Sequence, residues 1–330
     1  MKLFISLILV LILIGIPLIG SNVSGLVYLF GVIIPYIAIL TFVIGMSVRV
    51  LKWAKIPVPF KITTTCGQQK SLPWINNNNL ESPHNTAGVF WRMALEVLFF
   101  RSLFRNTRTG LKEGPKIVYG PDKILWAASL AFHWSFLVIF IRHFKIFLQE
   151  VPQFIPLLES LDGFMQIGLP ILFMTDAALL LGLTVLFLRR IVDPKLRYIS
   201  LVADYFPLLL IIGIALTGVW MRYFGKVDII SVKQFTLGLF SFQPIIPDGI
   251  SAIFFAHLFL VSALLIYFPL SKLVHFGGIF LSPTRNMSNN NREVRHINPW
   301  NPKVKLHTYE EWEDEFRDVM KAADMPLEKE

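Results

Sequence analysis

The sequence is poor in cysteine and in charged residues. It has one cysteine, Cys66, and only 16% of its 330 residues are charged. A single cysteine excludes an intrachain disulfide framework and any zinc or iron–sulfur site built from four cysteines. No Cys-x-x-Cys-His occurs, which excludes covalent attachment of a c-type haem. No glycine-rich phosphate loop or nucleotide fingerprint is present either.

Apolar residues dominate the chain instead. They make up 54% of it, and the mean hydropathy is +0.59. About 20 consecutive apolar residues suffice to span a bilayer. Such stretches lie at about 3–20, 26–50, 124–148, 165–188, 199–221 and 250–276. The first lacks a small-x-small cleavage site, which favours a retained helix over a signal peptide. The sequence therefore predicts an all-α integral membrane protein with six transmembrane helices.

The net charge of +9 is concentrated in particular loops and is no sign of nucleic-acid binding. Lysine and arginine gather in 52–123, in 189–197 and in the tail from Lys272, whereas 149–164 is acidic and has no base. Basic loops favour the cytoplasmic side of a membrane. Both termini are therefore expected in the cytoplasm; the prokaryotic cytoplasmic membrane as the location is what the family resemblance described below implies.

This topology divides the chain into four parts. They are two transmembrane helices (1–52), a cytoplasmic loop (53–123), a membrane part of four helices (124–277), for which the histidines described next predict haem binding, and a cytoplasmic tail (278–330). In the loop, 86–105 is apolar with interspersed arginines, which predicts a helix lying on the membrane surface. In the tail, Thr308-x-x-Glu311 predicts a capping box that starts an amphipathic helix. Cys66 is expected in the cytoplasm and receives no role.

Four histidines lie inside the apolar stretches. His133 and His143 share the third stretch, and His257 and His275 share the sixth. Histidine is costly in hydrocarbon, so each one suggests function. A single such histidine is more often a packing residue or a proton relay, but two pairs on antiparallel helices favour metal. Zinc usually takes four ligands, and nearby Asp, Glu or Cys ligands are missing.

Haem iron is the metal that this pattern favours. Antiparallel order pairs His143 with His257 at an outer haem and His133 with His275 at an inner haem. Two histidines leave no open position on the iron, so such a haem passes electrons and does not bind oxygen. The depths do not match for straight helices, because the spacings correspond to about 15 Å and about 27 Å. Different tilts or a kink at Pro269 can reconcile them.

Three charged residues lie near these histidines in the sequence. Arg142 and Lys145 flank His143, and they either contact haem propionates or a quinone, or extend to the membrane interface. Asp176 is expected near the middle of the fourth helix. It either takes part in quinol chemistry or orients a histidine, or it forms a structural hydrogen bond in its protonated state.

The histidine spacing resembles a known pattern. His133-x₉-His143 followed by His257-x₁₇-His275 is similar to the nitrate reductase gamma subunit family, whose members are five-helix dihaem b quinol oxidases. Helices two to six, over about 26–276, correspond to that core. The segment from Val58 to Trp74, with Thr-Thr-Thr-Cys-Gly-Gln-Gln at its centre, resembles the M subunits of Dsr complexes (DsrM), which are associated with sulfite reduction.

The resemblance implies a function that the residues alone do not reveal. It implies two haem b groups, oxidation of menaquinol, and delivery of electrons to a cytoplasmic iron–sulfur subunit (DsrK-like) similar to heterodisulfide reductase. Further expected partners are DsrJ-, DsrO- and DsrP-like subunits and the lipid bilayer. The chain would be an electron-transfer subunit of an oxidoreductase. The alternatives are a cytochrome b subunit of nitrate or heterodisulfide reductase, and a haem-free proton-coupled transporter.

Overall fold

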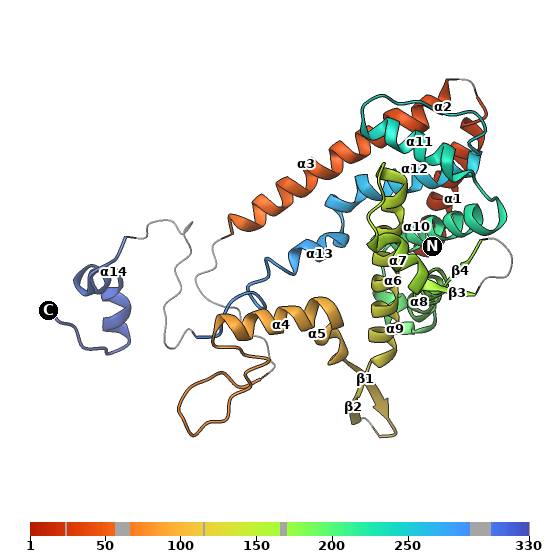
Figure 1. Cartoon of the computed structure of the whole chain (residues 1–330). Coiled ribbons are helices and arrows are strands. Elements are labelled where there is room, and N and C mark those ends of the chain that lie inside the picture. Colours follow the sequence, from red (N-terminus) through yellow and green to blue (C-terminus); the bar gives the residue numbers. More distant parts are fainter. Residues whose placement is uncertain (24, 57–66, 115, 166–169, 291–304, 330) are drawn as a thin grey trace.

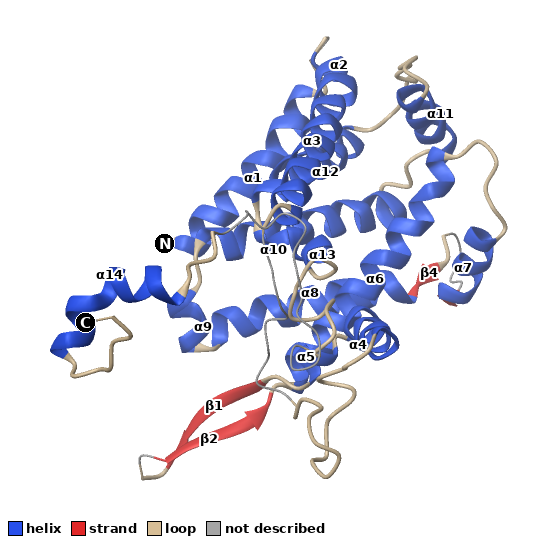
Figure 2. Ribbon diagram, turned by 90° about the vertical axis from the view of Figure 1, so that its left-hand side faces the viewer, coloured by secondary structure: helices blue, strands red, loops and turns tan. Residues whose placement is uncertain are grey.

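The structure, a computed structural model, describes residues 1–23, 25–56, 67–114, 116–165, 170–290 and 305–329. Cys66 and most of the Val58–Trp74 segment lie outside these ranges. Helices make up nearly all of the regular structure (Figure 2). The strands that it describes form two small antiparallel pairs: β1 (Thr107–Lys112) with β2 (Lys116–Pro121), and β3 (Gly163–Met165) with β4 (Leu172–Phe173). The prediction of a helical membrane protein is confirmed.

Within the described ranges, five helical segments are long and apolar enough to cross a membrane. They comprise α1 (Lys2–Gly20), α2 (Leu26–Tyr28) continuing through η1 (Leu29–Ile33) into α3 (Ile34–Ala54), α6 (Lys123–Phe147), α10 (Val202–Val219) with η2 (Trp220–Phe224), and α12 (Ala252–Tyr267) with η3 (Phe268–Leu270). Five of the six predicted stretches therefore correspond to candidate spans.

The predicted fourth span differs from the other five. The helix there, α8 (Met174–Val192), begins at Met174 and not at residue 165. Pro170 interrupts the apolar stretch, because proline lacks the N–H that a helix interior needs. Asp176 consequently lies in the first turn of α8, which corrects its expected mid-helix position. With Arg189 and Arg190 in the last turn, α8 carries charge at both ends.

Ion pairs join α8 to α6 at both ends. Asp122, at the start of α6, binds Arg189 at 2.5 Å, and Arg142 near the end of α6 binds Asp176 at 2.5 Å. Between these pairs the two backbones come close, since a Cβ on Gly182 would lie 3.0 Å from the Ala128 carbonyl oxygen. α8 therefore runs antiparallel to α6 along much of its length (Figure 1).

Interlocking side chains hold the first helix in the bundle. Val10 of α1 packs with Leu210 of α10 and Leu260 of α12, and all three are buried. Lipid tails are as apolar as leucine, so packing contacts hold membrane helices together, and the hydrophobic effect contributes little. The many exposed Leu, Ile and Phe side chains on α1 and α3 agree with a lipid-facing surface.

The predicted sixth helix is broken near its end. α12 stops at Tyr267, Pro269 lies in the 3₁₀ turn η3, and Ser271 is extended with φ −111° and ψ 179°. His275 follows on separate short helices, η4 (Lys272–Val274) and α13 (His275–Gly278). The expected irregularity at Pro269 is confirmed, and His257 and His275 therefore do not share one straight helix. Gly45 of α3 packs against Pro269.

The remaining helices lie in the connections and the tail. They are α4 (Thr86–Phe99), α5 (Arg101–Phe104), α7 (Phe154–Asp162), α9 (Pro194–Ile199), α11 (Ile229–Phe240) and α14 (Tyr309–Ala322). The helix expected at 86–105 is therefore two helices, divided at Phe100. The capping box of Thr308 and Glu311 is confirmed. Figure 1 shows α14 set apart from the bundle.

Candidate functional site: two histidine pairs

All four predicted histidines use the same ring nitrogen to bind the protein. Nδ1 contacts the Ser129 carbonyl oxygen in His133 (2.7 Å), the Ile139 carbonyl oxygen in His143 (2.7 Å), the Thr217 hydroxyl in His257 (2.9 Å) and the Lys272 carbonyl oxygen in His275 (3.0 Å). A carbonyl oxygen only accepts, so Nδ1 carries the proton in three of the four. Nε2 is then left with a lone pair, which is the form of histidine that binds a metal.

The fourth histidine reaches the same state through a hydroxyl group. Thr217 Oγ1 lies 2.8 Å from the Gly213 carbonyl oxygen, to which it donates its proton. The same oxygen therefore accepts from Nδ1 of His257. Gly218 on the next position of α10 faces the His257 ring, since a Cβ there would lie 3.4 Å from Cε1. Thr217 and Gly218 thus fix the plane of the His257 ring.

The structure brings together the inner pair of histidines. The ring centroids of His133 and His275 lie 6.0 Å apart, with an angle of 81° between the ring planes. Two metal–nitrogen bonds of about 2 Å, with roughly 1 Å from each nitrogen to its ring centre, would put the centres of two imidazoles that share one metal ion up to about 6 Å apart. The separation of the inner pair matches this value, so His133 and His275 would be the two residues to hold one metal ion. His143 and His257 lie close enough for electrostatic interaction.

The donor set fits haem better than a bare metal ion. Throughout the described ranges, no three His, Cys, Asp or Glu side chains gather as a possible metal site. A zinc site needs three or four protein ligands. Haem iron takes four nitrogens from its own macrocycle, so two histidines complete its coordination.

A buried charge network adjoins His143. Arg142 contacts Asp162 of α7 at 3.1 Å and Asp176 of α8 at 2.5 Å. The side chains of Arg142 and Asp162 are buried, and that of Asp176 is 13% exposed. Tyr223 donates to Asp176 at 2.8 Å, and Thr175 donates to Asp162 at 2.6 Å. Removal of one partner from a buried ion pair is strongly destabilising, because it leaves an uncompensated buried charge. The network therefore links α6, α7, α8 and η2 at this end of the bundle.

The three charged residues singled out in the sequence all have protein partners. Arg142 and Asp176 bind each other, and Lys145 binds Glu159 of α7 at 2.5 Å.

Sequence reasoning missed three residues of this region. Asp162 and Tyr223 carried no signal, because they lie in connecting segments far from the histidines in sequence. Thr217 also received no role from the sequence. A hydroxyl between Gly213 and Gly218 on an apolar helix was the available sign of its role.

The bundle and its paired histidines define the chain as a multi-pass helical membrane protein with two candidate haem sites. Comparison with known proteins specifies the class. Residues 95–295 match the family described as nitrate reductase gamma subunit, and these residues include all four histidines. The chain belongs to this family of membrane cytochromes b, and the resemblance seen in the histidine spacing is confirmed.

Two curated relatives are similar over most of their length. One, from Archaeoglobus fulgidus, is 43% identical over 281 residues, which cover 83% of this chain and 84% of the relative. The other, from Archaeoglobus profundus, is 40% identical over 280 residues, or 83% of each. Both are named Hdr-like menaquinol oxidoreductase cytochrome b-like subunit.

Proposed function

We propose that this chain is a dihaem cytochrome b subunit that oxidises menaquinol and passes electrons across the membrane to a cytoplasmic iron–sulfur subunit. The observation that carries the proposal is the common state of the four histidines, each held at Nδ1, which leaves Nε2 able to bind metal. Haem b, when bound, supplies reversible one-electron transfer. The names of the relatives support menaquinol as the electron donor.

His133 with His275 would hold the inner haem, and His143 with His257 the outer haem. Contacts of Arg142, Lys145 and Asp176 with haem propionates or a quinone stay predictions. Such a ligand would have to share Arg142 with its two aspartates and Lys145 with Glu159.

The proposed topology has six spans and both termini in the cytoplasm of a prokaryote. The ion pairs at both ends of α6 and α8 support α8 as the sixth span, because they hold α8 alongside a helix of full membrane-spanning length. The four parts of the chain, 1–52, 53–123, 124–277 and 278–330, follow from this topology. The basic loops favour the same orientation.

We infer a partner that resembles the catalytic iron–sulfur subunit of heterodisulfide reductase. The relatives support this, since both are named Hdr-like. A DsrM-type role, with DsrK-, DsrJ-, DsrO- and DsrP-like partners in sulfur metabolism, rests on the resemblance of Val58–Trp74, on the additional first helix and on the long loop after the second helix. Copurification from the native membrane, followed by identification of the bound iron–sulfur subunit, distinguishes this role from that of a cytochrome b subunit of nitrate reductase.

A reduced-minus-oxidised optical spectrum with pyridine-haemochrome quantitation tests the proposal. We expect two b-type haems per chain, and one or none in His143→Ala or His257→Ala. His307→Ala, in the tail, is the matched control and should keep both. Well-folded protein without haem would refute the proposal and favour the proton-coupled transporter. Haem reduction by a menaquinol analogue then tests the electron donor.

A further inference from the structure

Phe100 has an unusual backbone conformation for its residue type. It separates α4 from α5 with φ 51° and ψ 48°, which lies in the left-handed region. A helix commonly ends on such a residue, but the position is usually taken by glycine or asparagine. A large side chain there is a strained exception. Such strain persists where the surrounding structure requires it, which directs attention to the ring of Phe100.

The turn around Phe100 is tied to α6 through the last carbonyls of α4. The indole of Trp126 donates to the Phe99 carbonyl oxygen at 2.8 Å, and the indole of Trp134 donates to that of Leu98 at 2.9 Å. These bonds satisfy acceptors that a helix end leaves open. The turn is therefore held against the helix that carries His133.

The ring of Phe100 packs directly on His133. Their centroids lie 5.0 Å apart with the planes at 90°, and Phe132 contacts the same imidazole at 4.5 Å and 65°. Edge-to-face packing of this kind is a favoured aromatic geometry. Together with the Nδ1 bond to Ser129, the two phenylalanines fix the plane of the His133 ring.

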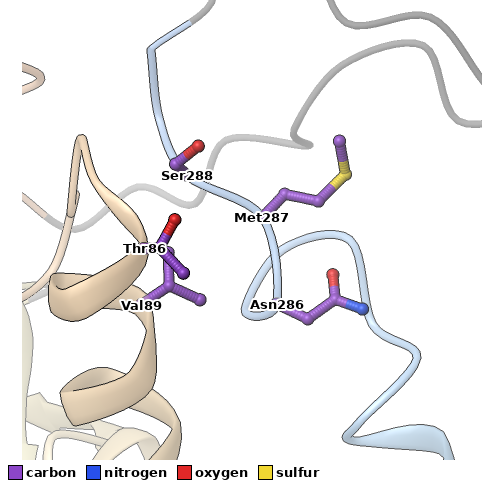
Figure 3. Close-up of a pocket in the computed structure, with 5 residues that line it drawn as sticks. All are labelled: Thr86, Val89, Asn286, Met287 and Ser288. Carbon is purple, nitrogen blue, oxygen red and sulfur yellow. The ribbon is translucent and has the colours of Figure 1, made fainter.

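Helix α4, which ends just before Phe100, also contacts the segment that follows His275. Glu96 of α4 accepts from Ser102 of α5 and pairs with Arg285 at 3.4 Å. Figure 3 shows Thr86 and Val89 of α4 facing the stretch from Asn286 to Ser288. α4 therefore contacts the helix that carries His133 and the segment that follows α13.

We propose that Phe100 is a positioning residue for the inner haem, which fixes the plane of its ligand His133 and keeps water from it. This inference rests on the proposed function, because it assumes a haem between His133 and His275. The shell around a metal site controls solvent access and thereby the redox potential. Water stabilises the more highly charged oxidised state, so loss of the Phe100 ring lowers the potential of the inner haem.

Phe100→Gly removes the ring but keeps the turn, because glycine adopts the left-handed conformation without strain. Phe100→Leu keeps apolar bulk, and Phe99→Ala removes the exposed neighbouring ring as the matched control. The readouts are a potentiometric optical titration that resolves both haems, and the electron paramagnetic resonance spectrum of the oxidised haems, which reports the orientation of the axial rings. Thermal unfolding confirms that each variant is folded.

We expect Phe100→Gly to lower the potential of one haem and change its resonance signal, with the other haem unchanged. Phe100→Leu should restore most of the potential, and Phe99→Ala should match the wild type. Two bound haems with unchanged potentials and signals in Phe100→Gly would overturn the inference alone, as would an equal shift of both haems. Absence of haem in the wild type would instead overturn the proposed function.

Discussion

Replacement of Thr217 by valine tests whether the hydroxyl group is needed to hold His257. Valine has nearly the same shape as threonine but lacks the oxygen that accepts from Nδ1 at 2.9 Å. Thr217 is only 6% exposed, so water cannot easily replace it. The Nδ1–H group of His257 would lose its acceptor.

The expected loss of haem-binding free energy in Thr217→Val follows from two separate estimates. A buried donor without an acceptor costs about 1–3 kcal/mol. Loss of the hydrogen-bond partner of a metal-bound histidine typically weakens metal binding by about 10–100-fold, which corresponds to about 1.4–2.7 kcal/mol. The Ile214 carbonyl is also within reach of His257 and limits the loss to the lower part of this range. The imidazole also becomes a weaker base, which raises the potential of the outer haem.

The assay is titration of purified protein with limiting haem, followed by pyridine-haemochrome quantitation and a potentiometric titration. Thr217→Val should retain the inner haem and bind the outer haem about 10-fold more weakly. Thr217→Ser, which keeps the hydroxyl, should behave as the wild type. If Thr217→Val binds both haems with unchanged affinity and potential, the hydroxyl does not support His257 and the reasoning is wrong.

Three further predictions concern stability. Gly45→Ala would place a Cβ 2.6 Å from the Pro269 ring and should destabilise the bundle by about 1–3 kcal/mol in detergent unfolding, whereas Gly15→Ala, with open space around it, should not. Arg142→Met should cost about 3–5 kcal/mol in the same assay, because two buried carboxylates lose their cation; an unchanged midpoint would show that the network adds nothing. Burial raises the pKa of Glu81, but hydrogen bonds from its two arginine partners outweigh this and hold the pKa below its ordinary value of 4.5. The stabilisation of the folded protein by ionised Glu81 is thus complete above pH 4.5. It disappears as the pH falls through the lower pKa that Glu81 has in the folded protein, so Glu81→Gln should flatten the acid limb of a stability–pH curve.

The long apolar runs predicted the positions of most helices well. α6 spans Lys123–Phe147 where 124–148 was expected, and α10 with η2 covers the fifth stretch. Such runs are reliable because lipid requires a continuous apolar helix. The capping box at Thr308 is local and was also predictable.

The features that the sequence did not reveal depend on partners far away in the chain. In the first turn of α8, the backbone N–H of Thr175 donates to the carboxylate of Asp162 at 2.9 Å. Asp162 belongs to another helix, α7. The division at Phe100 depends on two tryptophans of α6. The histidines were predictable because their polarity is conspicuous in an apolar run. The residues that orient them were not, because a threonine hydroxyl or a backbone carbonyl carries no such signal.

The short apolar stretch of α8 has a consequence for the lipid around the protein. Asp176 and Arg189 lie about 20 Å apart along the helix axis, whereas the hydrocarbon core of a typical bilayer is about 30 Å thick. Leu181 and Leu188 are exposed on this helix. With α8 as the proposed sixth span, these side chains would meet the acyl chains, and the ion pairs with α6 would prevent α8 from shifting to relieve the hydrophobic mismatch. The bilayer would then thin locally beside α8, and the protein should be most stable in membranes with short acyl chains.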